Sequence, residues 1–285
     1  MRILLTGKNG QIGSALERAL APLGQVVATD RAGLDLLDLN SIKNRIEKEK
    51  PDVIVNAAAY TAVDRAESER QLAFQANADS MRAIGEAAKA SGALVVHFST
   101  DYVFDGEKLA PYLESDAPTP INVYGESKLA GERILAATGC RHFIFRTSWV
   151  YGPRGRNFLL AILAAARAKP ELRVVDDQRG APTSSGAIAA ATARVLSSPA
   201  FSSKPSGIYH MSAAGETSWH GFAKAILDGA GLRTAVVAIR SEEYPAAARR
   251  PKNSLLDNAK LVATFGIALP DWRQGLREVS SKIDT

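Results

Sequence analysis

The stretch Thr6-Gly7-Lys8-Asn9-Gly10-Gln11-Ile12-Gly13 decides how this 285-residue chain folds. It follows the apolar run Ile3–Thr6 and opens a helical pattern. Gly7 permits a tight turn, Gly10 lets the backbone approach a pyrophosphate, and Gly13 lets helix and strand pack closely. Because a helix N-terminus offers unpaired N–H groups to an anion, Gln11 and Ile12 join the glycines as predicted contacts. The order strand, turn and helix therefore predicts a dinucleotide-binding loop.

Outward from this loop, the first half of the chain alternates apolar runs with helical segments. The runs are nearly continuous rather than alternating, which is typical of strands covered by helices on both faces of a parallel sheet. The predicted strands are Ile3–Thr6, Val26–Thr29, Val53–Asn56, Leu94–Ser99 and His142–Arg146, and the longest predicted helices cover 66–91 and 123–137. This pattern predicts an α/β fold, a Rossmann-type doubly wound parallel sheet over residues 1–150 that binds NAD(P).

Beyond residue 150 the alternation loosens. Gly207–Met211 is the one clear strand candidate, and Pro245, Pro251 and Pro270 interrupt the C-terminal third. We expect residues 151–285 to form mainly a smaller C-terminal α/β lobe that binds substrate. The boundary is blurred, because several of its elements can return to the main sheet.

Composition bounds the partners and the location. Thirty-five Lys and Arg against 30 Asp and Glu give a net charge of +5 without a long basic run, so no nucleic-acid partner is predicted. The single Cys140 excludes an intramolecular disulfide. Glycines follow the first strand too early for a signal peptide, and the apolar runs are too short to span a membrane. These features predict a cytoplasmic protein with no membrane partner.

Asp30 ends the second predicted strand, where an acid accepts hydrogen bonds from the adenosine ribose. That position favours NADH, but Arg31 follows at once and suits the 2′-phosphate of NADPH. Both cofactors therefore stay open. Asp38 and Leu39 lie where the chain can pass the adenine, and a solvated loop is an equally good interpretation of them.

Tyr124-Gly125-Glu126-Ser127-Lys128 places a phenol and an ammonium on one face of a helix. A nearby cation favours the phenolate, so such a tyrosine can deliver a proton to a carbonyl near neutral pH. Thr100, directly after the fourth strand, is placed to hydrogen-bond that carbonyl. Ala58, Ala59 and Tyr60 follow the third strand, at the same sheet edge, where small residues let a cofactor lie close.

Together these motifs resemble the extended short-chain dehydrogenase/reductases, and within that family most of all the dTDP-4-dehydrorhamnose reductases. The resemblance runs from residue 6 to about residue 273. Besides the glycine loop, the segments that carry it are 59–67, 99–106, 122–125, 145–151, 177–183 and 249–254.

The resemblance implies reduction of the 4-keto group of dTDP-6-deoxy-L-lyxo-4-hexulose to dTDP-L-rhamnose, with NADPH or NADH. It implies Tyr124 as proton donor, Lys128 as its activator and as a cofactor contact, and Thr100 as the third catalytic residue. Asp101 and Trp149 would contact the sugar, and Asn77 would support the site. Magnesium at a dimer interface is known in the family, which makes a homodimer one expectation, but no motif here identifies metal ligands.

Other residues have plainer interpretations. His97 and His142 lie in apolar runs and are predicted to be structural, and His210 and His220 lack metal-ligand spacing. The loop that carries Arg249 and Arg250 is a solvated face by default. A dTDP-sugar carries a diphosphate, however, so Arg250 is predicted to bind it, with Arg249 as the alternative.

Two other functions stay open at this point. One is another nucleotide-sugar enzyme, such as an epimerase or a dehydratase. A dehydratase is expected to carry acid/base carboxylates beside the threonine, and Thr100-Asp101-Tyr102 offers no adjacent Glu. The other is a non-catalytic regulatory subunit that binds a dinucleotide. The complete set of Thr100, Tyr124 and Lys128 argues against it.

Overall fold

Six parallel strands form the central sheet of the computed structural model, which describes residues 1–198 and 201–283. All six were predicted from the sequence, and their bounds differ by at most one residue at either end. Across the sheet they run β10 (Gly207–His210), β5 (His142–Thr147), β4 (Leu94–Thr100), β3 (Val53–Asn56), β1 (Arg2–Thr6) and β2 (Gln25–Thr29).

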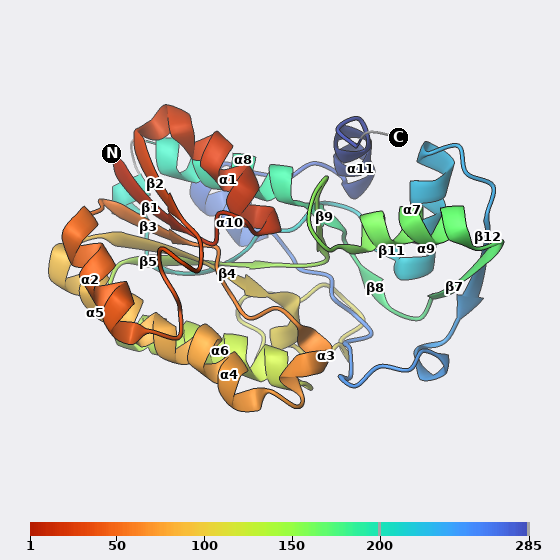
Figure 1. Cartoon of the computed structure of the whole chain (residues 1–285), viewed down its shortest axis with the longest axis horizontal. Coiled ribbons are helices and arrows are strands. Elements are labelled where there is room, and N and C mark those ends of the chain that lie inside the picture. The colour runs from red at the N-terminus through yellow and green to blue at the C-terminus, as the bar shows by residue number, and fades with distance from the viewer. Residues whose placement is uncertain (199–200, 284–285) are drawn as a thin grey trace.

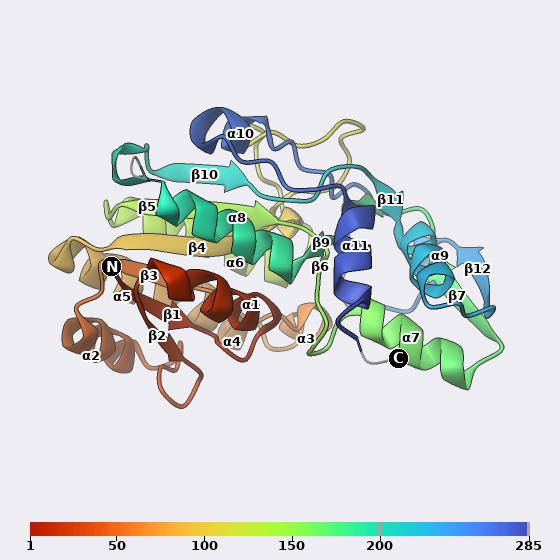
Figure 2. The same cartoon turned by 90° about the horizontal axis from the view of Figure 1, so that it is seen from above.

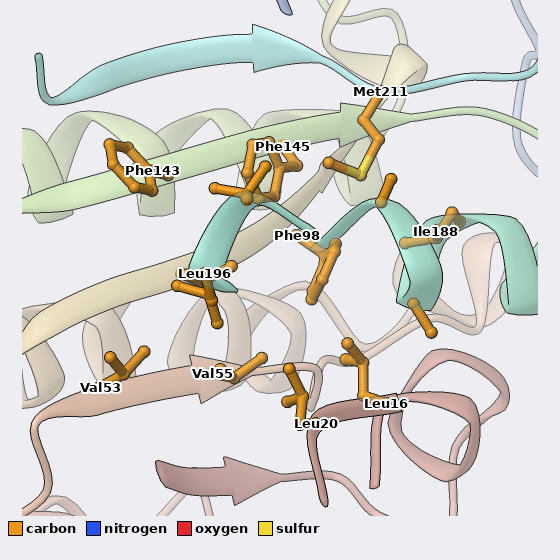
Figure 3. Close-up of a cluster of buried hydrophobic side chains, with 14 of the residues drawn as sticks. Leu16, Leu20, Val53, Val55, Phe98, Phe143, Phe145, Ile188, Leu196 and Met211 are labelled. Atoms are coloured by element: carbon orange, nitrogen blue, oxygen red, sulfur yellow. The ribbon is translucent and has the colours of Figure 1, made fainter. Parts of the chain in front are cut away.

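Helices cover both faces of this sheet (Figures 1 and 2). One face carries α1 (Gln11–Leu20), α8 (Ser185–Ser197) and α10 (Ala259–Phe265), and the other carries α2 (Leu39–Glu49), α5 (Ser80–Ser91) and α6 (Val123–Ala137). Figure 3 shows Leu16 and Ile188 packed with Val55 and Phe98 on the first of these faces. Alternate strand residues thus enter two different cores, which explains the unbroken apolar runs and confirms the doubly wound fold.

The order of the strands locates the site. From β1 the chain crosses through α1 to β2, and from β2 it passes through α2 on the opposite face to β3. The chain therefore reverses direction between β1 and β3. In open α/β sheets a ligand binds at such a switch point, outside the carboxyl ends of the strands.

The prediction of one continuous helix over residues 66–91 is wrong, because this segment is divided into several shorter elements. The structure has α3 (Val63–Ala66), α4 (Arg70–Phe74), a π-helical turn η2 (Gln75–Asp79) and then α5. Glu67 and Glu69 lie in the break because tertiary contacts engage them. Glu67 accepts from the Val123 N–H at 2.9 Å, and Glu69 accepts from the Tyr60 hydroxyl at 2.7 Å. Tertiary hydrogen bonds have overridden a helical pattern here.

The second part of the chain builds a smaller lobe around β7 (Glu171–Val175) and the parallel β12 (Ala235–Ile239). Its helices are α7 (Phe158–Ala168), α9 (Trp219–Gly229) and α11 (Trp272–Ser280), which share one apolar core. Between these elements in the chain, α8, β10 and α10 return to the main sheet (Figure 2).

Short elements complete the described residues. The two-residue strands pair as β6 (Val150–Tyr151) with β9 (Thr183–Ser184) and as β8 (Arg179–Gly180) with β11 (Thr217–Ser218). The 3-10 turns are η1 (Ala21–Leu23), η3 (Asp101–Val103), η4 (Phe201–Ser203) and η5 (Ser241–Glu243). In the part of the chain that the structure describes, no helix is long and apolar enough to cross a membrane.

Candidate active site

A cavity of about 890 Å³ opens at the carboxyl ends of the central strands, where it reaches from the glycine loop to the smaller lobe. Most of the predicted site residues line it. They are Gly7, Gly10, Gln11, Ile12, Asp30, Ala58, Ala59, Tyr60, Thr100, Asp101, Tyr124, Lys128 and Trp149. The structure thus brings together residues that are up to 142 positions apart in the chain, Gly7 and Trp149 being the most distant pair.

The glycine loop has the geometry of a phosphate cradle. Gly7 has φ +73°, and a Cβ there would lie 2.8 Å from the Ala58 nitrogen. Gly13 does not line the cavity, because it packs against the loop itself, where a Cβ would lie 2.0 Å from the Gly7 oxygen. No side chain caps α1 at Gly10, so its first N–H groups are left for an anion. These residues fit the pyrophosphate of a dinucleotide.

The far end of the cavity holds Asp30 and Arg31. The Asp30 carboxylate accepts from the Gly33 N–H at 3.2 Å and lies 3.6 Å from the Lys8 ammonium. The Gly33 hydrogen bond comes first among the causes that lower the pKa of Asp30. Arg31 is paired with Asp35 at 3.1 Å, and its side chain is 76% exposed. Both predicted determinants of cofactor choice are therefore present at this end.

The structure does not place Asp38 and Leu39 in the cavity. The Asp38 carboxylate caps α2 by accepting from the N–H groups of Asn40 and Ser41, and Leu39 is the first helical residue. Leu36 and Leu37, slightly earlier in the chain, line the cavity instead. An aspartate directly before a helical pattern is an N-cap signal, which was available in the sequence.

Thr100 ends β4, Asp101 begins the 3-10 turn η3 directly after it, and both are buried residues that line the cavity. The Thr100 hydroxyl donates to Asp101 Oδ1 at 3.1 Å. Burial raises the pKa of Asp101 to about 6, although hydrogen bonds from Ser254 and Thr100 oppose the rise. Asp101 Oδ2 has no hydrogen-bond partner among the described residues. It is a buried acceptor on a residue that lines the cavity, and a ligand hydroxyl could satisfy it.

Tyr124 reaches the same place from the first turn of α6. Gly125 permits this approach, because a Cβ there would lie 2.1 Å from the Tyr102 carbonyl oxygen. Loss of solvation, and then the Asp101 carboxylate, raise the pKa of Tyr124 above its ordinary value, while hydrogen bonding to Thr100 opposes them. From the sequence, Lys128 was expected to lower this pKa. Burial and the Asp101 carboxylate favour the protonated phenol instead.

The reason lies in what Lys128 contacts. Its ammonium donates to the Phe98 carbonyl at 2.7 Å and lies 3.1 Å from His97 Nε2, and its side chain is 2% exposed. Burial lowers the pKa of Lys128 to about 8, and the Glu132 carboxylate opposes that change. Lys128 thus lines the cavity close to Tyr124 in sequence, but two of its three donors face β4.

Asn77 supports this end of the cavity from the π-helical turn. Its amide accepts from the Tyr60 N–H at 2.8 Å, donates to the Tyr60 carbonyl at 3.0 Å, and donates to the Ser127 hydroxyl at 2.9 Å. It therefore ties the chain after β3 to α6. Asn77 is buried, so it is not a solvent-facing residue of this helical segment.

Trp149 lies at the lobe end of the cavity in a strained backbone conformation, φ +48°. A Cβ on Gly180 would lie 2.4 Å from its Cε2 atom and 2.7–2.8 Å from Cζ2 and Cδ2, so Gly180 stands over one ring face. Trp219 stacks on the other face with ring centroids 3.6 Å apart. Both faces are covered, so the predicted sugar contact requires the ring edge or a displacement of Trp219. No sequence pattern predicted Trp219 at this site, because only the folded chain brings the two indoles together.

Arg250 is not among the residues that line the cavity. Its guanidinium pairs with Asp64 at 2.7 Å and donates to the Ala248 carbonyl at 3.0 Å. The neighbouring Arg249 is exposed, and its carbonyl accepts from the Asn122 amide at 2.8 Å. The basic loop is thereby attached to α3 and to the start of α6, and its contact with a diphosphate stays a prediction.

Residues 1–198 and 201–283 contain no group of three or more His, Cys, Asp or Glu side chains that could hold a metal ion. His97 and His210 are buried, and Cys140 is a buried thiol. Residues 1–198 and 201–283 therefore identify no set of magnesium ligands.

Known proteins resemble this chain over its full length. The family described as RmlD substrate binding domain matches residues 1–285. The chain belongs to this family. Among RmlD-family relatives, the dTDP-4-dehydrorhamnose reductase of Burkholderia thailandensis is 48% identical over 96% of both chains. The Escherichia coli K12 protein of the same name is 44% identical over 100% of this chain and 99% of its own.

A solved RmlD-type structure agrees with this placement. The crystal structure of a Bacillus anthracis dTDP-4-dehydrorhamnose reductase, described as a complex with NADP, superposes with a TM-score of 0.93. It is 35% identical and covers 99% of both chains. The family resemblance and the fold class predicted from the sequence are thereby confirmed.

Proposed function

We propose that this chain is a reductase that transfers a hydride from NADPH or NADH to the 4-keto group of dTDP-6-deoxy-L-lyxo-4-hexulose and forms dTDP-L-rhamnose. The observation that carries the proposal is a single cavity that joins a phosphate cradle at Gly7 to the side chains of Thr100, Tyr124 and Lys128. The relatives of the chain named above carry the name of this activity.

The residues of the chain divide the work. A bound reduced nicotinamide supplies the hydride. Tyr124 supplies the proton to the carbonyl oxygen, and its raised pKa keeps the phenol protonated until that oxygen becomes basic. Thr100 hydrogen-bonds the same oxygen, and Asp101 Oδ2 accepts from a sugar hydroxyl. Lys128 directs its free N–H toward the cofactor ribose and Tyr124.

The glycine loop and the strand ends hold the cofactor. The N–H groups at the start of α1 would hold the pyrophosphate, and Ala58 and Ala59, which line the cavity, would leave room for the dinucleotide. Asp30 accepts from the adenosine ribose, and Arg31 meets a 2′-phosphate where one is present. A homodimer remains a separate prediction that light scattering tests.

The experiment follows the absorbance of NADPH and NADH with a panel of dTDP-, UDP- and GDP-linked keto sugars. Oxidation with the dTDP-4-keto sugar is the expected result. Oxidation with a UDP or GDP sugar alone would replace the proposed substrate by that of another nucleotide-sugar enzyme. If no keto sugar is reduced while the dinucleotide still binds, the chain is a non-catalytic binding subunit and the proposal is wrong.

A further inference from the structure

A row of three buried polar side chains runs beneath the cavity floor. Thr6, Asn56 and His97 occupy paired positions on β1, β3 and β4, so their side chains lie on the same face of the sheet. The Thr6 hydroxyl donates to Asn56 Oδ1 at 2.5 Å, and Asn56 Nδ2 lies 3.0 Å from His97 Nδ1. Each of the three is 1% exposed. Polar groups in such a position need complete hydrogen bonding.

The row ends on Lys128. An ammonium has three N–H donors, and the Phe98 carbonyl and His97 Nε2 lie at hydrogen-bonding distance from this one. Both partners belong to β4, which is fixed in the centre of the sheet. Only the third donor is left for the cavity that Lys128 lines. The imidazole therefore helps to set the direction of that donor.

We propose that His97 is a positioning residue of the reductase, which accepts a hydrogen bond from the Lys128 ammonium and thereby aims the remaining Lys128 N–H at the cofactor ribose and Tyr124. This inference rests on the proposed function. It departs from the prediction that His97 is only structural, because the imidazole contacts a side chain that lines the cavity.

The hydrogen-bond roles along the row depend on one another. If Nε2 accepts from a charged Lys128, the His97 proton is on Nδ1 and must meet the amide oxygen of Asn56. If Lys128 is neutral, Nε2–H donates to the amine, the Asn56 amide nitrogen donates to Nδ1 and the Thr6 hydroxyl donates to Asn56 Oδ1, which is the amide orientation of the structure. With a charged Lys128 the Asn56 amide takes the opposite orientation, and its nitrogen then donates to the Thr6 hydroxyl. The charge of Lys128 is thus coupled to the tautomer of His97 and to the orientation of the Asn56 amide, whose oxygen and nitrogen are assigned by such partners.

The surrounding charges favour a neutral imidazole. Burial first, and then Lys128 and His142, lower the pKa of His97 well below its ordinary value. On α6, Tyr124 and Glu132 are the titratable neighbours of Lys128, and Glu132 is engaged by the buried Arg146 of β5 at 2.6 Å. Because a neutral His97 stabilises the charged form of Lys128, its removal lowers the pKa of Lys128 further.

The test compares His97→Phe, which removes both ring nitrogens, with His97→Gln, whose amide oxygen replaces the Nε2 acceptor. With charged Lys128 as the active form, kcat/KM of the wild type falls as the pH rises through about 8. We expect His97→Phe to lower kcat/KM about tenfold or more and to move this basic limb to lower pH. In His97→Gln, both kcat/KM and the pH at which it falls should be close to the wild-type values.

A matched control is His142→Phe. His142 is a buried histidine on the adjacent strand, and its ring contacts the Cys140 carbonyl rather than Lys128. In the His142→Phe variant, the fall of kcat/KM at high pH should occur at the same pH as in the wild type. If His97→Phe also leaves the limb in place, or if His97→Gln is as impaired as His97→Phe, His97 contributes packing alone and the inference is wrong.

A second experiment measures the His97 tautomer in the wild-type protein, so it depends neither on the folding of a variant nor on catalytic turnover. Nitrogen-15 NMR of the histidine rings in the wild-type protein should show the Nδ1–H tautomer for His97 near pH 7 and a change to Nε2–H as the pH passes about 8. An Nε2–H ring at every pH overturns the inference. A wild type that reduces no keto sugar refutes the proposed function instead, so the two failures are distinguishable.

Discussion

The two ends of the cavity differ in what surrounds their charges. At the reaction end, formed by Thr100, Asp101, Tyr124 and Lys128, the residues Asp101 and Lys128 are each only 2% exposed. At the ribose end, formed by Asp30 and Arg31, the side chains are 35% and 76% exposed. Both ends carry ionisable groups from strand ends and the segments that follow them, so the local sequence motifs alone do not reveal the difference.

Burial decides how far those groups depart from their ordinary chemistry. Loss of solvation moves the pKa of Lys128 down to about 8 and that of Asp101 up to about 6. At the ribose end, water and salt screen Arg31 and Asp30. Changes at the reaction end should therefore have large effects on rate and stability, and changes at the ribose end should adjust a preference.

The largest effect is expected for Tyr124→Phe, which removes one oxygen and keeps the ring. General acid catalysis is typically worth about 10²–10⁴-fold, so kcat should fall by roughly that factor. Dinucleotide affinity, measured by fluorescence titration, should stay near that of the wild type. Lys128→Met should lower both kcat and the dinucleotide affinity, because Lys128 is proposed to contact the cofactor ribose as well as Tyr124. A Tyr124→Phe variant that retains most of its activity would remove the proposed proton donor.

Asp101→Asn tests the electrostatics of the same end through stability. The raised pKa of Asp101 means that the unfolded chain loses this proton near pH 3.8 and the folded chain only near pH 6. The resulting penalty is absent below about pH 4, grows up to about pH 6 and then stays constant, at about 3 kcal/mol. The difference in unfolding free energy between pH 4 and pH 7 should therefore favour the variant by about that amount, as measured by urea titration.

Asp105→Asn provides a control of opposite sign. Hydrogen bonds from the Glu107 N–H and the Tyr112 hydroxyl lower the pKa of Asp105, so its carboxylate stabilises the fold above the ordinary pKa and this contribution is lost as the pH falls. Asp105→Asn should lose stability at pH 7 relative to pH 3. If both variants respond to pH in the same way, burial is not what distinguishes Asp101.

Arg250→Ala tests whether Arg250, which lies outside the cavity lining, contacts the substrate diphosphate. If Arg250 contacts the substrate diphosphate, its loss should raise KM for the dTDP-sugar by the equivalent of about 2 kcal/mol and leave the dinucleotide affinity unchanged. Asp64→Asn is the matched variant, because it breaks the 2.7 Å pair and keeps the guanidinium. Equal losses in the two variants would mean that Arg250 only attaches its loop to α3. A rise in KM for Arg249→Ala alone would transfer the role to Arg249.

The smallest effect is expected at the ribose end. Asp30→Ala removes a carboxylate that repels a 2′-phosphate, so the ratio of kcat/KM for NADPH to that for NADH should rise a few-fold. Arg31→Ala should lower the same ratio. The shifts should shrink at high ionic strength because Arg31 is exposed and Asp30 is only half-buried. An unchanged ratio in Asp30→Ala would show that Asp30 does not contact the ribose.

The sequence predicted the features that depend on local patterns but not those that depend on tertiary contacts. The glycine loop, the strands and the Tyr124/Lys128 pair follow from local patterns, which periodicity and spacing record. The Trp149–Trp219 stack and the contact of His97 with Lys128 were not predicted, since tertiary packing alone brings these residues together. The pKa of Tyr124 was expected to fall because only Lys128 is near it in the sequence. In the folded chain, burial and the Asp101 carboxylate raise this pKa.

The most direct test of the central claim follows the transferred hydrogen. The wild-type protein is incubated with the dTDP-4-keto sugar and NADPH that carries deuterium at C4 of the nicotinamide, on each face in turn. The account predicts that one of the two labelled forms yields dTDP-L-rhamnose with deuterium at C4 of the sugar, seen by mass spectrometry and NMR. A product without label from either form, or no product at all, would contradict it.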